Sequence, residues 1–157
     1  MWMQALNLPD HGVKTKHGPD GDRVFDPVRR QWVALTPEEW VRQHVINHLA
    51  HDLGCPMALM AVEKQLLMNK LARRADIVVH DRNGRPVLLV ECKAPTVKID
   101  QSTFEQAARY NTVFKVPYLL VSNGITHYCC RVYQDDGRVE FMQAVPPYDA
   151  LCSPLPR

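Results

Sequence analysis

The sequence predicts an α/β fold in which helices flank a mixed β-sheet, and three observations favour it. Val87–Val90 is a continuous apolar run, typical of a strand that is covered on both faces. Helix start signals lie on either side of this run, at Thr36 and at Ser102. A further apolar run, Tyr118–Ser122, follows the second helix. A strand, a helix and a strand in this order predict a parallel pair joined by a right-handed crossover.

The first helix has a clear start and a clear end. Thr36 is the expected N-cap, Pro37 occupies the first helical position, and Glu39 completes a capping box. Apolar residues recur every fourth position along one stripe and lead to Gly54, which ends the helix: Val41, Val45, Leu49 and Leu53. Before the helix, residues 23–25 and 31–35 are expected to form a short hairpin around Asp26-Pro27.

Three strands are expected next. The first spans Leu59 to Met68, with Glu63 and Gln65 on one face, and the second spans about Ala75 to His80. Asp81-Arg-Asn-Gly84 supplies a tight turn with residues that tolerate positive φ, so the third strand, Pro86 to Cys92, is antiparallel to the second.

The second half of the chain begins with another helix. Ser102 and Glu105 form a capping box for a helix that runs to about Phe114. After the Tyr118–Ser122 strand, turns at Asn123-Gly124 and at Asp135-Asp136-Gly137 separate two more strands, expected at 128–133 and 139–145. The predicted order is therefore α-β-β-β-α-β followed by C-terminal strands.

The length and composition predict one globular domain. The chain has 157 residues, 46% of them apolar, and we expect a loosely ordered arm at 1–22, a single domain at 23–148 and a tail at 149–157. No apolar run approaches the roughly 20 residues of a membrane span, and no signal peptide is evident. Five cysteines without C-x-x-C spacing are expected to be reduced. These features predict a cytoplasmic protein without a membrane partner.

The second and third strands carry the residues with the most informative chemistry. Asp76 lies in the second strand, and the apolar third strand ends in Glu91-Cys92-Lys93. Glu91 and Lys93 are two residues apart and leave the strand on the same face. Two carboxylates and an ammonium group at one point are suited to metal-assisted hydrolysis of phosphodiesters. The alternative is an ordinary surface hairpin with a charged cluster.

The sequence resembles a known family in a series of motifs over roughly residues 20 to 148. It is similar to the N-terminal nuclease domain of type I restriction enzyme R subunits, within the PD-(D/E)xK nuclease superfamily. The motifs are Thr36-Pro-Glu-Glu-Trp-Val-Arg-Gln43, Glu63-Lys-Gln65, Arg74-Ala-Asp76, Leu89-Val-Glu-Cys-Lys-Ala-Pro95, Gln106-x-x-x-Tyr110-Asn111 and Ser122-Asn-Gly124. The resemblance implies a restriction-endonuclease-like core and an endodeoxyribonuclease activity that depends on Mg²⁺, with Mn²⁺ as a substitute.

The resemblance also implies roles for individual residues. Asp76 and Glu91 are expected to bind the metal ion, with the backbone carbonyl of Cys92 as a third ligand. Lys93 is expected to stabilise the charge that develops on the phosphate or to help deprotonate the attacking water. Gln106 and Tyr110 share a helix face and are expected to contact the substrate. The alternative for this pair is that Gln106 is solvated and Tyr110 packs in the core.

Two further acids have competing explanations. Glu39 resembles an additional acid that many superfamily members direct at the metal, but its capping-box position also explains it. Arg42 lies one turn further on and is placed to pair with Glu39. Glu63 either faces the same cleft or pairs with a nearby lysine. His44, His48 and His51 lie along one helix face, yet they lack the H-E-x-x-H pattern, so a solvated or half-buried face is expected rather than a zinc site.

The charge of the chain bears on its partners. A formal net charge of +2 leaves few cations for general DNA binding, although Arg29-Arg30, Arg73-Arg74 and Lys93 with Lys98 form local basic patches. No G-x-x-x-x-G-K-[S/T] loop is present. DNA is the expected substrate, with targeting or translocation supplied by a partner protein, and an oligomer is compatible with the sequence. The alternative function is a catalytically silent nuclease-fold module for binding or assembly.

Overall fold

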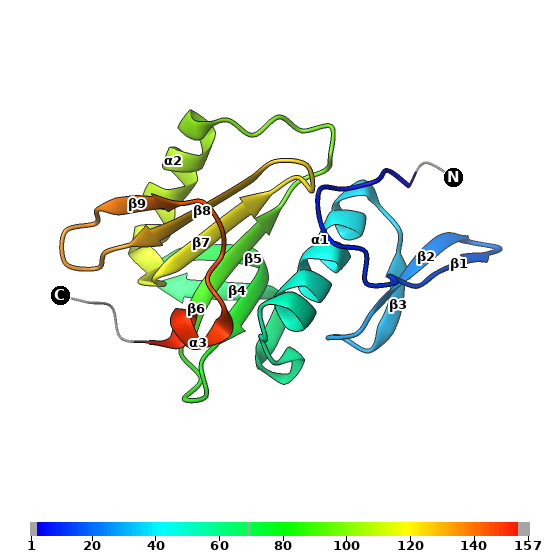
Figure 1. The fold of residues 1–157 in the computed structure, drawn as a ribbon, viewed down its shortest axis with the longest axis horizontal. Coiled ribbons are helices and arrows are strands. Elements are labelled where there is room, and N and C mark those ends of the chain that lie inside the picture. The colour runs from blue at the N-terminus through cyan, green and yellow to red at the C-terminus, as the bar shows by residue number, and fades with distance from the viewer. Residues whose placement is uncertain (1–2, 69, 154–157) are drawn as a thin grey trace.

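A computed structural model of the chain describes residues 3–68 and 70–153, and it contains two β-sheets (Figure 1). The small antiparallel sheet comprises β1 (Thr15–Gly18), β2 (Gly21–Asp26) and β3 (Gln31–Ala34). The larger sheet has six strands in the order β4-β5-β6-β7-β8-β9. Their bounds are Met60–Met68, Leu71–His80, Pro86–Cys92, Tyr118–Ser122, His127–Val132 and Val139–Met142.

The six-stranded sheet is mixed, as the sequence predicts. Strands β5 and β6 are antiparallel, whereas β6 and β7 are parallel and are joined through α2 (Gln101–Asn111). The remaining neighbouring pairs are antiparallel. The predicted fold class, a mixed sheet flanked by helices, is confirmed.

Helices cover both faces of this sheet. On one face, α1 (Pro37–Asn47) and α3 (Tyr148–Cys152) pack on alternate residues of the central strands, among them Ile77, Leu88 and Val90. On the other face, α2 packs through Phe104 and Ala108 on Leu89 and its neighbours. Short helical turns complete the chain at His48–Asp52, Met57–Leu59 and Thr112–Phe114. No described helix is long and apolar enough to cross a bilayer.

The first helix begins where its sequence predicts, because Thr36 has an extended backbone and its hydroxyl accepts a hydrogen bond from the Glu39 amide at 3.1 Å. The start of α2 differs from the prediction. Asp100, not Ser102, is the N-cap, and its carboxylate accepts from the Thr103 amide at 2.8 Å. Asp100 takes the N-cap position directly before Gln101, and Ser102 therefore lies inside the first turn of the helix.

Both ends of the chain are more ordered than the expected arm and tail. The segment 1–22 contains β1 and the start of β2, and the Asn7 amide donates to the Gly124 carbonyl oxygen at 2.8 Å. At the other end, residues 149–152 belong to α3, whose Leu151 is only 2% exposed in the core. Each segment buries apolar side chains against α1 or the sheet, and the expected domain bounds of 23 and 148 stay a prediction. Residues 1–2 and 154–157 of the expected arm and tail lie outside the described chain.

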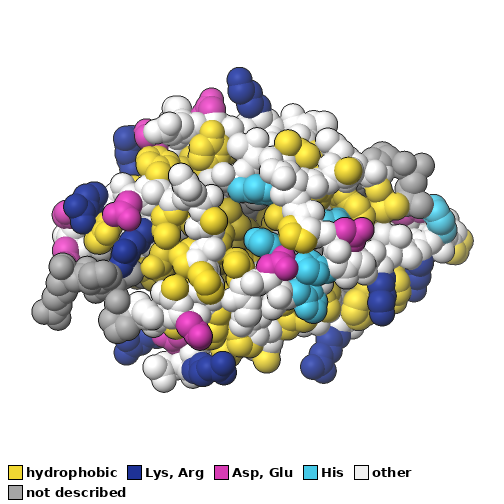
Figure 2. Space-filling view, viewed as in Figure 1, with side chains coloured by type: hydrophobic (Ala, Val, Ile, Leu, Met, Phe, Trp, Pro, Cys, Tyr) yellow, Lys and Arg dark blue, Asp and Glu magenta, His cyan; other side chains and the backbone are white. Residues whose placement is uncertain are grey.

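The N-terminal segment covers part of α1 and the β7–β8 turn. A small cavity of about 170 Å³ lies beneath it, with Leu8, Val45 and Leu120 among its lining residues. Apolar side chains and histidines gather near the middle of this face of the molecule (Figure 2). The Cys55, Cys92, Cys129, Cys130 and Cys152 thiols are all free, as expected for reduced cysteines.

Gly124, in the β7–β8 turn, lies directly beneath Leu6 of the N-terminal segment. Its φ is +86°, and a Cβ there would lie 2.8 Å from the Leu6 Cδ2 atom. Gly124→Ala should therefore combine backbone strain of about 1–2 kcal/mol with overpacking of a further ~1 kcal/mol or more. Urea unfolding measures the loss. Gly137→Ala is the matched control, because Gly137 has φ +71° but nothing within 4 Å of an added Cβ. Equal losses in the two variants would contradict the packing of Leu6 on Gly124.

Candidate functional site

Three acidic residues occupy one row across β4, β5 and β6. The β4–β5 register pairs the residues on either side of Glu63 and Asp76, and so places these two acids opposite one another. In the β5–β6 register Ile77 pairs with Val90, and the next position places Asp76 beside Glu91. Glu63 has a left-handed backbone with φ of 55°. That conformation is uncommon outside glycine and interrupts the regular pleat of β4 at this row.

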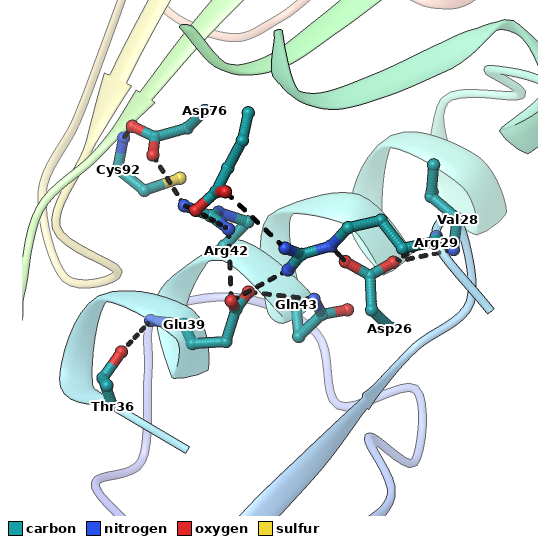
Figure 3. Close-up of polar contacts among 10 residues, drawn as sticks. Asp26, Val28, Arg29, Thr36, Glu39, Arg42, Gln43, Asp76 and Cys92 are labelled. Atoms are coloured by element: carbon teal, nitrogen blue, oxygen red, sulfur yellow. Dashed lines mark hydrogen bonds and ion pairs between the residues drawn. The ribbon is translucent and has the colours of Figure 1, made fainter. Parts of the chain in front are cut away.

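A fourth acid, Glu39, reaches the row from α1. Its amide is used for the helix cap, but its carboxylate accepts hydrogen bonds from side chains, including Gln43 Nε2 at 3.1 Å. The Glu39 side chain is 10% exposed. Of the two explanations for Glu39, the capping box accounts only for its backbone, because the carboxylate is turned toward the other acids (Figure 3).

Arg42 joins the acids of α1, β4 and β5, as Figure 3 shows for Glu39 and Asp76. Its Nη1 donates to Glu39 at 3.1 Å and to Glu63 at 3.3 Å, and its Nη2 donates to Asp76 at 2.9 Å and to Glu63 at 3.3 Å. The expected pairing of Arg42 with Glu39 is confirmed. Among the described residues, Glu63 pairs with Arg42 and Arg29 and with no lysine, and it faces the same group of acids.

Arg29 is the second cation of the cluster, and Asp26 anchors it. The Asp26 carboxylate, which is fully buried, accepts from Arg29 Nε at 2.6 Å and from the amides of Val28 and Arg29 at 2.8 Å each. Asp26 therefore closes the β2–β3 turn and aims the guanidinium at the cluster. Arg29 Nη2 then donates to Glu39 at 2.9 Å. We call Asp26, Arg29, Glu39, Arg42, Glu63 and Asp76 the acid–arginine cluster.

Both guanidinium groups are held in the charged form. Burial opposes the charge on Arg42, but the nearby charges of Glu39 and Asp76 outweigh it and raise the pKa of Arg42 above its ordinary value. Burial also opposes the charge on Arg29. The hydrogen bonds that Arg29 donates to Asp26 and Glu39 outweigh that effect and raise the pKa of Arg29 in the same way. Neither arginine can leave the cluster by losing its proton.

The cluster has the chemistry of a divalent-cation site. Four carboxylates and two guanidinium groups leave an excess of two negative charges, and carboxylate oxygens are the hard ligands that Mg²⁺ prefers. Asp76 and Glu63 keep side-chain exposures of 27% and 39%, so the site is open on one side. Across residues 3–68 and 70–153, no group of three Asp, Glu, His or Cys side chains has the arrangement needed to hold a metal ion. In the acid–arginine cluster, Arg42 donates hydrogen bonds to Glu39, Glu63 and Asp76.

Glu91 and Cys92 are divided between the two faces of β6. Cys92 belongs to the core beneath α1, and its amide donates to Asp76 Oδ2 at 2.7 Å. Glu91, the adjacent residue, forms an ion pair with Arg73 of β5. Burial, together with the Asp76 charge, raises the pKa of the Cys92 thiol well above its ordinary value, so the thiol is neutral. The structure thus brings Asp76 together with Glu39 and Glu63, while Glu91 has a partner of its own.

Lys93 extends the pairing of β6 by one residue. Its amide donates to the Ser122 carbonyl oxygen at 2.8 Å, and its side chain is exposed without an ion pair among the described residues. The ammonium is therefore available at the same strand end as Glu91.

Gln106 does not point toward the sheet. The buried face of α2 is formed by Phe104 and Ala108, and Gln106, two residues from each, is exposed on the opposite side. The expected sheet-side placement of Gln106 is therefore wrong, although a substrate contact from this exposed position stays a prediction. The side chain of Tyr110 lies outside the described part of the chain.

The three histidines of the first helical segment have separate surroundings. The His44 ring contacts the Trp40 carbonyl oxygen at 2.8 Å, and the His48 ring contacts Asp52 at 2.6 Å. The His51 ring lies beside that of His11, with 5.1 Å between centroids.

Sequence reasoning missed two members of the cluster. It treated Asp26 only as a turn residue and Arg29 as part of a basic surface patch, and it placed Arg73 in a second such patch. The available signal is the Asp-Pro-x-Arg order at the hairpin turn, since an aspartate at a turn commonly accepts from the amides that follow it. Nothing in the local sequence indicates that Arg29 then meets Glu39.

Comparisons with known proteins agree with the fold and with the motifs. The profile of the family "Type I restriction enzyme R protein N terminus (HSDR_N)" matches residues 37–146. A solved fragment of a candidate HsdR subunit of a type I restriction enzyme from Vibrio vulnificus YJ016 is 18% identical, with a TM-score of 0.51. The match covers 74% of this chain but only 24% of that one.

A second solved structure is a candidate nuclease of the DUF820 group from Anabaena variabilis ATCC 29413. It is 11% identical with a TM-score of 0.47, and the match covers 92% of this chain and 86% of that one. No curated protein matches the sequence.

The buried anchor of the cluster can be tested by its effect on stability. Asp26→Asn should lower the free energy of unfolding by about 3 kcal/mol, because it removes the charge that holds the partly buried Arg29. Urea denaturation followed by circular dichroism measures the change. Asp20→Asn in the exposed β1–β2 turn is the control and should change stability by less than about 0.5 kcal/mol. An Asp26→Asn protein as stable as this control would contradict the anchoring role.

Proposed function

Because the chain belongs to the family of the type I restriction enzyme R protein N terminus, we propose that it is a metal-dependent nuclease domain that hydrolyses DNA phosphodiester bonds in restriction or a related defence system. The observation that carries the proposal is the convergence of Glu39, Glu63 and Asp76 from three elements at a half-open site, with Glu91 in the same row. Acids that converge on one half-open point are typical of functional sites, where the electrostatic environment of titratable groups is strongly perturbed.

The proposed cofactor is Mg²⁺, with Mn²⁺ as a substitute. Asp76, Glu91 and Glu39 would hold it, with the Cys92 carbonyl as the expected backbone ligand and Glu63 as a further acid in the row. A bound ion would polarise the scissile phosphate and lower the pKa of a water molecule. The Cys92 amide, which donates to Asp76, keeps one oxygen of that carboxylate fixed.

Lys93 has a separate role in this proposal. Its ammonium is exposed at the end of β6, beyond the acids, and is free to approach a phosphate. There it would stabilise negative charge that grows in the transition state, an interaction that affects the rate more than the binding of the ion.

A partner chain is part of the proposal. The match spans only 24% of the Vibrio HsdR fragment, and the sequence contains no phosphate-binding loop. With a net charge of +2, the domain has few cations to spare for phosphates. A partner that supplies targeting or translocation would deliver the DNA, and it would compensate for both the missing phosphate-binding loop and the low positive charge.

A second candidate function is a binding or assembly module that keeps the acids but cuts nothing. It is favoured by the pairing of Asp76 with Arg42 and of Glu91 with Arg73, which neutralises both expected metal ligands internally. A plasmid-cleavage assay with Mg²⁺ or Mn²⁺ separates the two, since only the nuclease nicks or linearises DNA.

The metal ligands give the first test of catalysis. Asp76→Asn and Glu91→Gln should each reduce cleavage at least about 100-fold, and EDTA should abolish it in the wild type. Circular dichroism checks that the variants are folded. Asp149→Asn, on an exposed part of α3, is the matched control and should cleave like the wild type. Cleavage by Asp76→Asn at the wild-type rate would exclude this carboxylate from the site.

Lys93 gives an independent test. Lys93→Gln should reduce single-turnover cleavage by about 100-fold and leave the affinity for Mn²⁺ within about twofold, because the ammonium is not a ligand. Calorimetry and single-turnover kinetics measure the two quantities, with the exposed Lys98→Gln as control. Lost metal binding with unaltered cleavage would reverse the assignment.

A further inference from the structure

We propose that Arg42 is the resident cation of the acid–arginine cluster, and that a divalent metal ion binds by exchanging with its guanidinium group. Arg42 bonds to Glu39, Glu63 and Asp76, the acids that are candidates to hold the ion (Figure 3 labels Glu39 and Asp76). The inference rests on the proposed function for the metal site, but it does not require that the protein cuts DNA.

Arg42 blocks the approach of an ion to these oxygens along the direction of its own hydrogen bonds. Nη2 lies 2.9 Å from Asp76 and Nη1 lies 3.1 Å from Glu39, both at hydrogen-bond distance. A ligand oxygen of Mg²⁺ lies about 2.1 Å from the ion. The guanidinium therefore has to withdraw from an oxygen before that oxygen can bind the metal in the same direction.

Arg42 is held less completely than a permanent structural arginine would be. Its Nε is buried and has no hydrogen-bond partner among the described residues. A buried donor without a partner lowers the stability of the arrangement that buries it. The Arg42 side chain is thus held in place by its attraction to the charged acids. A competing cation of higher charge that neutralises the acids would remove this attraction.

Arg29 provides the contrast within the same cluster. Its Nε donates to Asp26 at 2.6 Å, and Asp26 is fixed by two backbone amides of the β2–β3 turn. Arg29 reaches Glu39 at 2.9 Å but lies 3.9 Å from Glu63 and forms no ion pair with Asp76 among the described residues. We therefore assign Arg29 as the permanent cation and Arg42 as the exchangeable one.

The charge balance agrees with an exchange. Without Arg42, the acids Glu39, Glu63 and Asp76 face one another across a half-buried site, which is unfavourable. A divalent ion replaces the single charge of the guanidinium with two. The apparent affinity for the ion is then reduced by the work of displacing Arg42, in the same way that any competing state reduces apparent affinity.

Metal binding and stability test the exchange without any activity assay. Calorimetric titration with Mn²⁺ alone should show that Arg42→Gln binds the ion about tenfold more tightly than the wild type, and that it gains more thermal stability from the ion. Without metal, Arg42→Gln should be less stable than the wild type. Arg30→Gln is the charge-matched control, because Arg30 is exposed and outside the cluster, and its affinity should match that of the wild type. Equal or weaker binding by Arg42→Gln would overturn the proposal and make Arg42 a residue that positions the acids.

A second measurement uses the wild type, so it does not depend on a variant that folds. The Arg42 Nε–Hε resonance in a ¹⁵N spectrum is assigned by its absence from the spectrum of Arg42→Lys. This resonance should shift when the wild type is titrated with Mg²⁺, which is diamagnetic and is expected to occupy the same site as Mn²⁺. The Arg29 resonance should stay in place. An Arg42 resonance that is unmoved at metal saturation would overturn the exchange, as would failure of the wild type and both Arg42 variants to bind a divalent ion. Metal exchange in a protein that cuts no DNA would contradict the nuclease and leave the exchange intact.

Discussion

The structure of this domain depends on ion pairs between two arginines and four acids that come from four different elements. Asp26 closes the β2–β3 turn, Glu39 comes from the first turn of α1, and Glu63 and Asp76 come from β4 and β5. The small sheet lies beside α1, and among the described residues its three strands contribute no side chain to the two main core clusters (Figure 1). Half-buried acids without these cations would repel one another. The same contacts therefore join the small sheet to α1 and keep the acids at one end of the main sheet.

Much of the fold follows from local sequence signals that agree with one another. The Val87–Val90 run, the Asn83-Gly84 turn and the helix between the two central strands are sufficient to predict an antiparallel and a parallel pair, and both are present. The errors occur where two local signals compete or where burial is not local. Asp100 and Ser102 are both good caps, and only the backbone shows that Asp100 takes this place. The burial of Leu151 depends on contacts with strands far away in sequence.

The site shows the same division between local and non-local information. Asp76, Glu91 and Lys93 could be proposed from the sequence because their spacing on two strands is a local pattern. Their partners could not, since the pairing of Arg73 with Glu91 and of Arg29 with Glu39 arises only after the strands and the turn are assembled. Gln106 illustrates the limit of periodicity. A four-residue spacing from Tyr110 is typical of one helix face, but it does not say which face is buried, and here Phe104 and Ala108 determine that.

The internal use of arginines bears on how the domain would engage nucleic acid. Arg29, Arg42 and Arg73 all form ion pairs with carboxylates. The basic patches predicted at Arg29-Arg30 and Arg73-Arg74 therefore each have one arginine that is already paired. Lys93 keeps an exposed side chain at the end of β6, one residue beyond Cys92, where the proposed function has it meet a phosphate. Affinity for DNA grows with the number of phosphates that are neutralised. The acid–arginine cluster has an excess of acids and would repel a phosphate until a metal ion compensates them. Within the proposed function, the metal therefore has to precede or accompany the substrate.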